Sequence, residues 1–420
     1  MNTYPVGVSL EEAFELIFGE IMNYRTEAEA VDVLEAVGRI AAEDIISKEN
    51  IPAFDKSPYD GYAFKSSDTK DASQVQPVRL KILEEIPAGS WPKYEVHSGE
   101  ASKILTGAPV PEGADAVIPY ENTHFTDTYV DIMQPYKSDC NVIHAGEDIG
   151  VGDIVICRGQ VMDASNAAML AGLGISKIPV RKKLKTAILC TGSELIDIDE
   201  QPGNGKIRNT NYYLLAGELL EQHMLPVNEG MTEDNPKRIA KKLQEALTYC
   251  DCVITTGGAS VGDYDVMKEA AELAGGRLLF WKIRMKPGSA AATAIIQGKP
   301  VFILSGNPAA AAVTFHMLVL PILRRMSGYR CIYPRRYQVR MLETFKKASP
   351  NRRFVRGRMI VKNGEVYFAA GNKQGNNMVS SMSECELFAD IPAGSGSIPE
   401  GELVFAWDLK HMTDLRGMNL

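Results

Sequence analysis

The chain has 420 residues, of which 45% are hydrophobic and 23% are charged, and its formal net charge is −8. This length exceeds what a single hydrophobic core organises, so we expect two to four domains. The net negative charge argues against a general binder of nucleic acids or membrane surfaces, which needs positive charge to neutralise phosphates. The seven scattered cysteines contain no CxxC pair, which favours reduced thiols in a cytoplasmic protein over zinc sites.

The N-terminal part shows helical spacing of apolar residues in the segments SLEEAFELIF and AEAVDVLEAVGRIAAEDI. Ser9 and Glu12 fit a capping box at the start of the first helix. The absence of a basic region and of a small-residue cleavage site argues against a signal peptide. A helical pattern returns at residues 163–175, so we expect a discontinuous helical domain made of residues 1–50 and 144–180.

Residues 51–143 are rich in proline, glycine and short β-branched runs, which predicts a β-rich insert between the two helical pieces. Two motifs stand out in this insert. The segment SPYDGYAF places Asp60 in a tight Asp-Gly turn, and LTGAPVPEGADAVIP places Thr106 in a loop that leads into a strand. Judged by spacing alone, both motifs are turns.

Strands and helices alternate over residues 181–330, which predicts a parallel sheet covered by helices on both faces. The expected strands are KTAILC, DCVITT and PVFILS, and the expected helices are NYYLLAGELLEQH, PKRIAKKLQEALTYC and NPAAAAVTFHMLVLPIL. The longest apolar run, residues 309–323, is judged too short to span a bilayer. Residues 331–420 return to short strands, with a hairpin turn at Asn363-Gly364, and predict a small C-terminal β domain. The chain is thus expected to be a multidomain α/β plus β protein.

Three of the expected strands end in polar, glycine-containing turns: TGSEL, TTGGASVGDYD and SGNPAA. Ligands bind outside the carboxyl ends of the strands in open parallel sheets, and glycine lets the backbone approach a ligand closely. Asn307 can cap the following helix and Pro308 suits its first turn, which would leave free N–H groups for an anion. The candidate binding residues are Thr191, Gly192, Glu194, Gly257, Gly258, Ser260, Gly262, Ser305, Gly306, Asn307 and Pro308.

A single turn of this kind is more often only a turn, whereas three in one sheet favour a binding site. None of the three matches the phosphate-binding loop of ATPases or the GxGxxG fingerprint of dinucleotide-binding proteins. Glu194, Asp234 and Asp265 supply hard oxygen donors that can hold Mg²⁺ against a bound phosphate, although each alone is equally well a surface acid or a helix cap. Lys282 and Lys286 can clamp an anion, or simply be solvated.

Taken together, seven motifs in this order and spacing resemble the molybdopterin molybdenumtransferase family, also called the MoeA family. They are SPYDGYA, TGAPVPEGADAVIP, AGEDI, TGSEL, TTGGASVGDYD, FWKIRMKPG and SGNPA, and the match covers nearly the whole chain. The resemblance implies an extended helical domain, a β-rich insert, an α/β molybdopterin-binding domain and a C-terminal β-barrel. It also implies an elongated homodimer in which the insert of one subunit meets the cleft of the other.

The resemblance further implies a reaction of adenylylated molybdopterin with molybdate, in which AMP is released and molybdenum enters the dithiolene, assisted by Mg²⁺. An adenylyltransferase is a possible partner that delivers the pterin. Motif matching assigns Glu194, Asp234 and Asp265 to the pterin and metal side of the site. It assigns Asp60, Thr106 and Asp148 to the insert face, and matches Lys282 and Lys286 to the family's motif lysines.

The sequence also departs from the family pattern. The family usually reads KPGKP after the second lysine, and here the segment is KPGSA, with Ser289 and Ala290. Loss of a charged donor can weaken oxyanion binding by roughly 1.5–3 kcal/mol. Other departures are Tyr59, Ser193, Ser305 and Asn376.

These departures leave two alternatives open: an insertase with an altered oxyanion preference, such as tungstate, and a pterin-binding scaffold that has lost turnover. A nucleotide pyrophosphatase built on the shared α/β domain is a further alternative, against which the presence of the insert argues. A basic run at residues 335–358 is interpreted as a solvated face of the C-terminal domain, with a docking surface for an acidic partner as the other interpretation.

Overall fold

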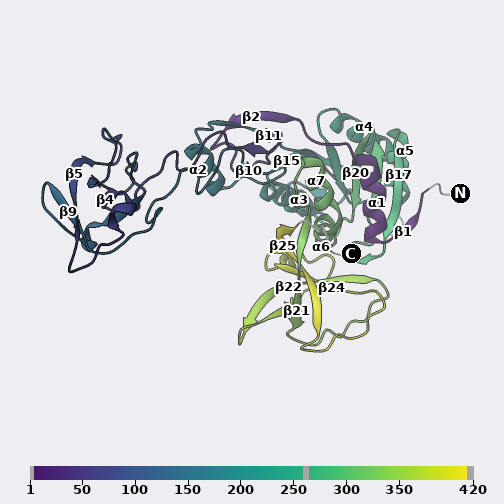
Figure 1. Cartoon of the computed structure of the whole chain (residues 1–420). Helices are drawn as coiled ribbons and strands as arrows, with labels where there is room; N and C mark the ends of the chain where they lie inside the picture. Colours follow the sequence, from purple (N-terminus) through teal and green to yellow (C-terminus); the bar gives the residue numbers. More distant parts are fainter. Residues whose placement is uncertain (1–3, 259–263, 414–420) are drawn as a thin grey trace.

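The computed structural model describes residues 4–258 and 264–413. The molecule is elongated: the β-rich insert, with β4, β5 and β9, lies at one end, and the α/β part lies at the other (Figure 1). A slender region with β2, β11, β10 and α2 separates them, and the C-terminal strands form a unit beside the α/β part. The expected multidomain α/β plus β architecture is therefore confirmed.

A mixed seven-stranded sheet forms the centre of the α/β part, in the order β1-β17-β19-β20-β16-β12-β15. Only β19 runs against its neighbours, because it is joined to β20 by a two-residue turn, Gln297-Gly298, in which both residues have positive φ. The prediction of a parallel sheet is thus correct for the strands at the glycine turns and wrong for β19. The strands are β1 (Val6–Val8), β12 (Lys185–Thr191), β15 (Leu225–Thr232), β16 (Cys252–Thr256), β17 (Arg277–Ile283), β19 (Ala292–Ile296) and β20 (Lys299–Leu304).

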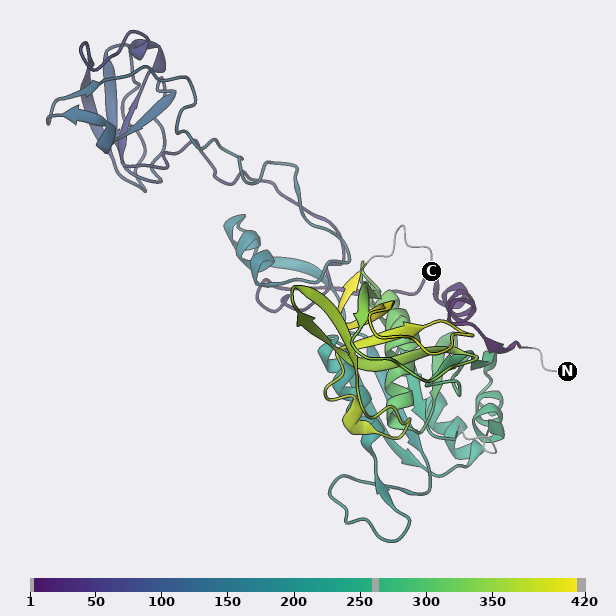
Figure 2. The same ribbon diagram turned by 90° about the horizontal axis from the view of Figure 1, so that it is seen from below.

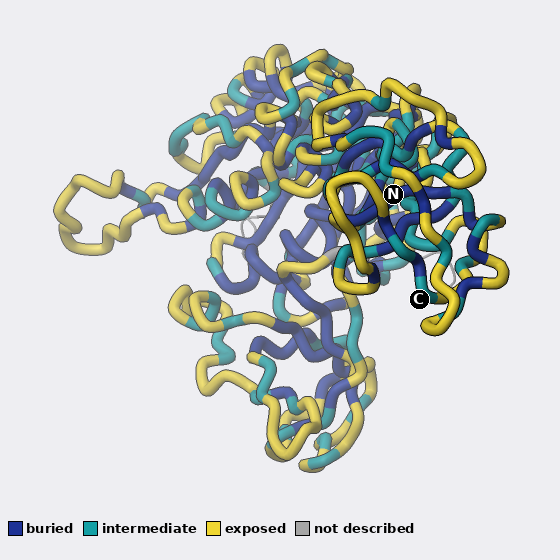
Figure 3. Tube along the Cα trace, turned by 60° about the vertical axis from the view of Figure 1, so that its left-hand side comes forward, coloured by how far each residue is buried: buried dark blue, intermediate teal, exposed yellow. Residues whose placement is uncertain are grey.

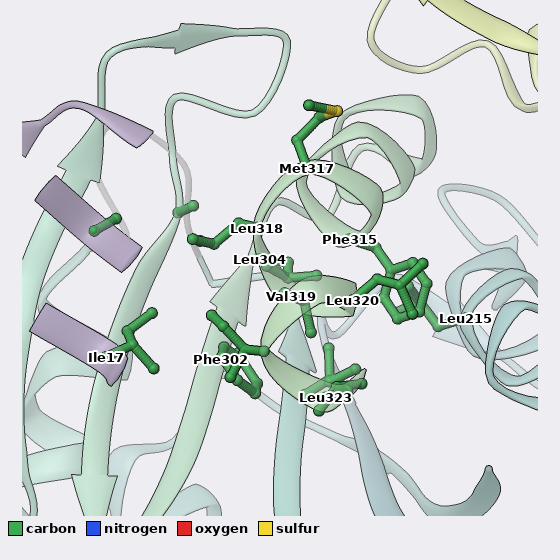
Figure 4. Packing of buried hydrophobic residues seen from close by; sticks show 14 of the residues in the cluster. Ile17, Leu215, Phe302, Leu304, Phe315, Met317, Leu318, Val319, Leu320 and Leu323 are labelled. Carbon is green, nitrogen blue, oxygen red and sulfur yellow. The ribbon is translucent and has the colours of Figure 1, made fainter. Parts of the chain in front are cut away.

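Helices cover both faces of this sheet, as predicted. In β20, Phe302 and Leu304 belong to one buried cluster, and Val301 and Ile303 belong to another on the opposite face, as the two-residue period of a strand requires. Figure 4 shows Ile17 of α1 packed near Phe302 and the core helix. The first face carries α1 (Leu10–Ile21), α3 (Thr210–Glu221), α6 (Pro308–Thr314), the π-helical segment Phe315–Val319 and α7 (Leu320–Ser327); the second carries α4 (Pro236–Ala246) and α5 (Tyr264–Leu273).

The most apolar helical stretch of the described residues, Pro308–Ser327, has 20 residues and is long and apolar enough to cross a membrane. The expectation from the 309–323 run, that this stretch is too short, was therefore wrong on length. However, 94% of the apolar window is buried inside the protein, where it forms the core helix. Its composition is explained by this burial.

The N-terminal segment differs from the prediction in two respects. The capping box is present: the Ser9 hydroxyl accepts from the Glu12 N–H at 3.1 Å, and the Glu12 carboxylate accepts from the Ser9 N–H. However, β1 pairs with β17 and α1 packs on the central sheet, so both belong to the α/β core and not to the helical domain expected for residues 1–50. Residues 28–46 are not helical either, because β2 (Ala28–Asp32) pairs with β11 (Lys177–Arg181).

The slender region joins the insert to the core through two chain segments that run side by side (Figure 2). Bridges between Ile51 and Ile149 and between Lys56 and Ile143 hold these segments together. The region contains β3 (Ile45–Ile46), β10 (Ile154–Ile156) and the predicted helix, α2 (Ala164–Gly172). The insert is a six-stranded sheet with its own buried cluster: β4 (Gly61–Phe64), β5 (Val78–Ile86), β6 (Glu100–Ile104), β7 (Ala116–Pro119), β8 (Thr123–Phe125) and β9 (Tyr129–Ile132).

The C-terminal strands close into a barrel, because β22 pairs with both β23 and β24 and the remaining strands complete the ring. Its interior is buried and its loops are exposed (Figure 3). The predicted Asn363-Gly364 turn joins β22 to β23, with φ of 53° and 78°. The strands are β21 (Tyr333–Met341), β22 (Arg352–Lys362), β23 (Glu365–Ala370), β24 (Leu387–Ile391) and β25 (Leu403–Thr413), and β18 (Met285–Lys286) of the α/β part adds to β22.

Candidate functional site

A cleft of about 850 Å³ lies at the carboxyl ends of β12, β16 and β20, where the three glycine turns were expected to meet. It is lined by residues from all three turns, by the loop after β18, and by one loop of the barrel. The predicted residues that line it are Thr191, Gly192, Glu194, Asp234, Gly257, Gly258, Ser305, Gly306, Asn307 and Pro308. Ser260 and Gly262 lie outside the described residues.

The three turns touch one another, and this contact requires glycine. A Cβ atom on Gly257, whose φ is +97°, would lie 2.0 Å from the carbonyl oxygen of Thr191. A Cβ atom on Gly306 would lie 3.3 Å from the Cα atom of Gly257. The glycines therefore let three strand ends converge and leave their backbone groups at the cleft.

Two of the three proposed metal ligands line this cleft. The Glu194 carboxylate lies over Gly192: a Cβ atom added to this glycine would be 2.6 Å from both carboxylate oxygens. Asp234 follows β15 and lines the same cleft. Asp265 falls in the first turn of α5, and its side chain lies outside what the structure describes. Among the described side chains, no group of three or more His, Cys, Asp or Glu is arranged to hold a metal ion.

The hydrogen bonding at the N-terminus of α6 differs from the prediction. Asn307 occupies the N-cap position, but its side chain makes no capping hydrogen bond, and its own N–H donates to the Ser305 hydroxyl at 3.2 Å. The Ala309 N–H donates to the carbonyl oxygen of Asn376 at 3.0 Å. Pro308 has no N–H and the Ala309 N–H is already paired, so neither of these two residues offers a free N–H group to an anion.

Side chains of the barrel complete the cleft, including Asn376, which by sequence is only a departure from the family motif. Asn376, Asn377 and Val379 line it. Their loop is held by Arg356, a buried side chain that donates to the carbonyl oxygens of Lys373 at 3.2 Å and Gly375 at 3.0 Å. Burial lowers the pKa of Arg356, and its Nε and Nη1 atoms have no hydrogen-bond partner.

The interpretation of the basic run as a solvated face therefore fails at two of its arginines. Arg356 is inside the barrel, and Arg352 pairs with Glu11 of α1 at 2.6 Å and with Asp390 at 2.7 Å. Arg352 thus links the barrel to the α/β part. Arg356 lies in a run of four buried residues of β22, residues 354–357, and the charge count alone does not reveal this burial.

A second set of lining residues, missed by the sequence analysis, comes from the segment before α3. Lys206 donates to the Ser193 carbonyl oxygen at 2.6 Å. Asn209 caps α3, and the amide group of Asn211 donates to the Gly306 carbonyl oxygen at 2.8 Å. The N-cap position of Asn209 was the available signal, because it marks where a chain segment returns to the edge of the sheet. β13 (Leu195–Ile196) and β14 (Ile207–Arg208) form the base of this loop.

The two motif lysines do not line the cleft. Lys282, with φ of +67°, is exposed near the end of β17. Lys286 is exposed in β18, and its backbone lies in register with that of Arg353 in β22. The residues that follow them, Ser289 and Ala290, do line the cleft. The departure from the family motif therefore falls on the cleft surface itself.

The insert residues lie far from the cleft of the same chain (Figure 1). The Asp60 carboxylate accepts hydrogen bonds from the N–H of Thr106 at 2.7 Å and from its hydroxyl at 2.8 Å. These bonds, the backbone one first, lower the pKa of Asp60. Asp148 is exposed in the connecting segment, where its N–H donates to the Ile51 carbonyl oxygen.

Comparison with known proteins accounts for nearly the whole chain. Residues 8–174 match the MoeA N-terminal region (domain I and II), residues 187–325 a probable molybdopterin binding domain, and residues 338–409 the MoeA C-terminal region (domain IV). A molybdopterin molybdenumtransferase from Staphylococcus epidermidis is 34% identical over 402 residues, with 94% of each chain covered. One from Staphylococcus aureus is 36% identical over 390 residues, covering 91% of this chain and 92% of that protein.

Solved structures agree with these sequence relatives. The molybdopterin biosynthesis MoeA protein from Pyrococcus horikoshii OT3 is 31% identical, with a TM-score of 0.82 over 96% of this chain and 100% of that one. A second structure of the Pyrococcus horikoshii protein gives a TM-score of 0.81 at 29% identity, over the same shares of the two chains. The chain described here belongs to the molybdopterin molybdenumtransferase (MoeA) family.

Proposed function

We propose that this protein is a molybdenum insertase, which transfers molybdenum from molybdate into adenylylated molybdopterin and releases AMP. The observation that carries the proposal is the cleft where three glycine turns converge beside Glu194 and Asp234. Its volume of about 850 Å³ is in the range for small-molecule sites. The backbone groups of its glycine turns and the Lys206 side chain on its wall suit a phosphorylated ligand.

The chain's own residues suggest how the pterin is held. Thr191, Gly257 and Gly306 form a floor that a ligand can approach closely. Lys206 and Arg208, on the wall of the cleft, supply positive charge for phosphate oxygens. Asn376 and Asn377 add amide donors from the barrel side. The substrate would therefore lie between the sheet edge and the barrel.

Carboxylate oxygens are the ligands that Mg²⁺ prefers, so Glu194 and Asp234 fit this ion and would hold it together with substrate phosphates. When bound, Mg²⁺ supplies charge stabilisation for the phosphoanhydride and its leaving phosphate. Asp265 remains our third proposed ligand. The Glu194 carboxylate lies close to Gly192 and Glu194 lines the cleft, so this acid is at the cleft before any ion binds.

We also propose that two copies associate, with the insert of one beside the cleft of the other. Asp60 and Thr106 form a defined pair but lie at the far end of their own chain. Such an arrangement would bring the Asp60 carboxylate beside the cleft of the other copy, and Lys282 and Lys286 remain our proposed anion-binding residues outside the cleft lining. A cytoplasmic location and delivery of the pterin by an adenylyltransferase complete the proposal. We also propose residues 51–143 as the insert domain and residues 331–420 as the C-terminal domain.

The test is AMP release from adenylylated molybdopterin with Mg²⁺, in separate titrations of molybdate and tungstate. Release that saturates with molybdate supports the insertase. Saturation with tungstate alone would move the assignment to an insertase of altered oxyanion preference. Pterin binding without any release would favour the scaffold, with Ser289 and Ala290 as the first residues to examine.

A further inference from the structure

Four arginines converge where the slender region meets the α/β core, away from the cleft. They are Arg25, Arg158, Arg181 and Arg325, and they come from the segment after α1, the loop after β10, the end of β11 and the last turn of α7. Arg181 donates to the carbonyl oxygen of Thr26, the residue after Arg25, and the Thr26 N–H donates to Met326, the residue after Arg325, so these three arginines come from segments in contact. Burial first, and then nearby arginine charge that includes Arg158, lowers the pKa of both Arg25 and Arg181. We call this group the arginine joint.

Backbone contacts fix the segments that carry these side chains. The Thr26 N–H donates to the Met326 carbonyl oxygen at 3.1 Å, and the Arg330 N–H donates to the Gly159 carbonyl oxygen at 2.8 Å. The Arg181 side chain lies over Gly328, where a Cβ atom added to the glycine would be 3.4 Å from it. Arg181 also donates a hydrogen bond to the Thr26 carbonyl oxygen at 2.9 Å. The arrangement is therefore part of the fold and not an encounter of loose surface side chains.

No carboxylate neutralises the joint in the part of the chain that the structure describes. Arg25 donates to the carbonyl oxygens of Met22 and Tyr24, and Arg181 donates only to backbone carbonyl oxygens. The nearby acids are engaged elsewhere: Glu27 pairs with Lys182, and Glu29 pairs with Arg39. Asp44 accepts from the backbone N–H of Arg158.

The arginines have a purely structural use as well, which does not balance their charge. Arg25 follows the C-terminal end of α1 and Arg325 lies in the last turn of α7, where cations favour the helix dipole. Each helix end carries only about half an elementary negative charge. Two helix ends therefore leave most of four positive charges unbalanced, in a protein whose net charge is −8.

Two buried hydroxyl groups at the joint also lack partners. Thr26 is 6% exposed and Ser327 is 2% exposed, and neither side-chain oxygen has a hydrogen-bond partner. Buried polar groups are nearly always satisfied, so such a pair points to a bound water or ion. Ser327 also lines a cavity of about 10 Å³ together with Arg181 and Lys183; this cavity has room for about one water and is too small for a phosphate group, which would lie outside it.

We propose that the arginine joint binds a phosphate group, either as free phosphate or as the phosphate of a small monoester. A tetrahedral, doubly charged oxyanion offers enough acceptor atoms for several guanidinium groups, whose planar donors suit phosphate oxygens. The bound group would tie the slender region to α7. It would thereby restrain the direction in which the distant insert is held.

The test is isothermal titration calorimetry of the full chain with inorganic phosphate and, separately, with AMP, at constant ionic strength set by chloride. We expect binding to the wild-type protein, and about tenfold or greater loss of affinity in the double variant Arg158→Gln, Arg325→Gln. The matched control Arg79→Gln, Arg358→Gln removes two arginines elsewhere and should bind as the wild type does. Tighter binding of phosphate or of AMP identifies which source the joint prefers.

The proposal is overturned if the wild type binds neither ligand, or if the double variant binds both as tightly as the wild type. The second result would place phosphate in the catalytic cleft, which these substitutions leave intact. Should the double variant not fold, Arg158→Gln alone carries the test. Its side chain is exposed, and it should still lower the affinity several-fold.

Discussion

The N–H group of Ala309, at the start of the core helix, donates a 3.0 Å hydrogen bond to the carbonyl oxygen of Asn376 in the barrel. This bond joins residues that are 67 positions apart in the sequence, at 309 and 376. It fixes the barrel loop against the edge of the sheet. The barrel is thus a wall of the cleft and not an appended domain.

Replacing Arg356 by lysine should loosen this wall. The lysine cannot reproduce the paired bonds to the carbonyl oxygens of Lys373 and Gly375, which together are worth about 1–3 kcal/mol. We expect the free energy of unfolding to fall by about this amount in urea titrations, and the KM for the pterin substrate to rise. Arg358→Lys, at an exposed position of the same strand, should change neither; an unaltered KM in Arg356→Lys would contradict the role given to the loop.

Replacing Asp60 by asparagine should leave the fold intact and lower turnover by about tenfold or more, equivalent to ~1.4 kcal/mol in the barrier. The amide oxygen can still accept from Thr106, so only the negative charge is lost. AMP release under substrate saturation measures the effect. Asp68→Asn is the control, because Asp68 accepts similar bonds from Ser98 and Gly99 in the same insert. A wild-type rate in Asp60→Asn would make Asp60 a structural residue.

Thr106→Val should move the acid limb of the pH–rate profile to higher pH. The hydrogen bonds from Thr106 lower the pKa of Asp60, so the carboxylate stays ionised to lower pH than a free one. Valine removes the hydroxyl bond and keeps the backbone bond, so the pKa of Asp60 rises toward its ordinary value. Activity should then be lost earlier as the pH falls. Thr106→Ser keeps the hydroxyl and should retain the original limb; identical limbs in all three proteins would refute the link.

Ser289→Lys should strengthen oxyanion binding. Ser289 lines the cleft at the position where the family motif carries a lysine, and a charged donor there contributes about 1.5–3 kcal/mol. The molybdate concentration at half-maximal AMP release should fall by about ten- to a hundredfold. Ser289→Gln, which has similar length but no charge, separates electrostatics from size. Equal curves for the two variants would mean that this position does not contact the oxyanion.

Glu194→Gln should raise the Mg²⁺ concentration needed for half-maximal activity, by about tenfold for a loss of ~1.4 kcal/mol of binding. The substitution keeps the shape of the side chain and removes the charge that suits a hard cation. Glu233→Gln, an exposed residue paired with Arg238, is the neighbouring control. An unchanged Mg²⁺ requirement in Glu194→Gln would remove Glu194 from the metal site.

The sequence predicted three strands of the seven-stranded sheet, β12, β16 and β20, because each is a short buried run followed by a glycine turn. It also located the cleft, since parallel strands must end at one edge. It failed where tertiary pairing overrides local periodicity: the apolar spacing of residues 28–46 suggests a helix, but β2 is paired with β11. The membership of β1 and α1 in the core was equally hidden, because pairing with β17 spans most of the chain.

The site was predicted in part for a similar reason. Glycine turns and carboxylates are recognisable from local sequence, and the predicted residues Glu194 and Asp234 do line the cleft. Asn211 and Asn377 were missed, because nothing local distinguishes them from surface amides. They reach the cleft only through the packing of α3 and the barrel loop against the sheet edge.

The most direct test of the central claim is the ratio of AMP released to molybdenum incorporated, measured in one reaction with adenylylated molybdopterin, molybdate and Mg²⁺. An insertase predicts that the two quantities rise together in equal amounts. AMP release without molybdenum incorporation would contradict the account and make the protein a pyrophosphatase that uses the same cleft.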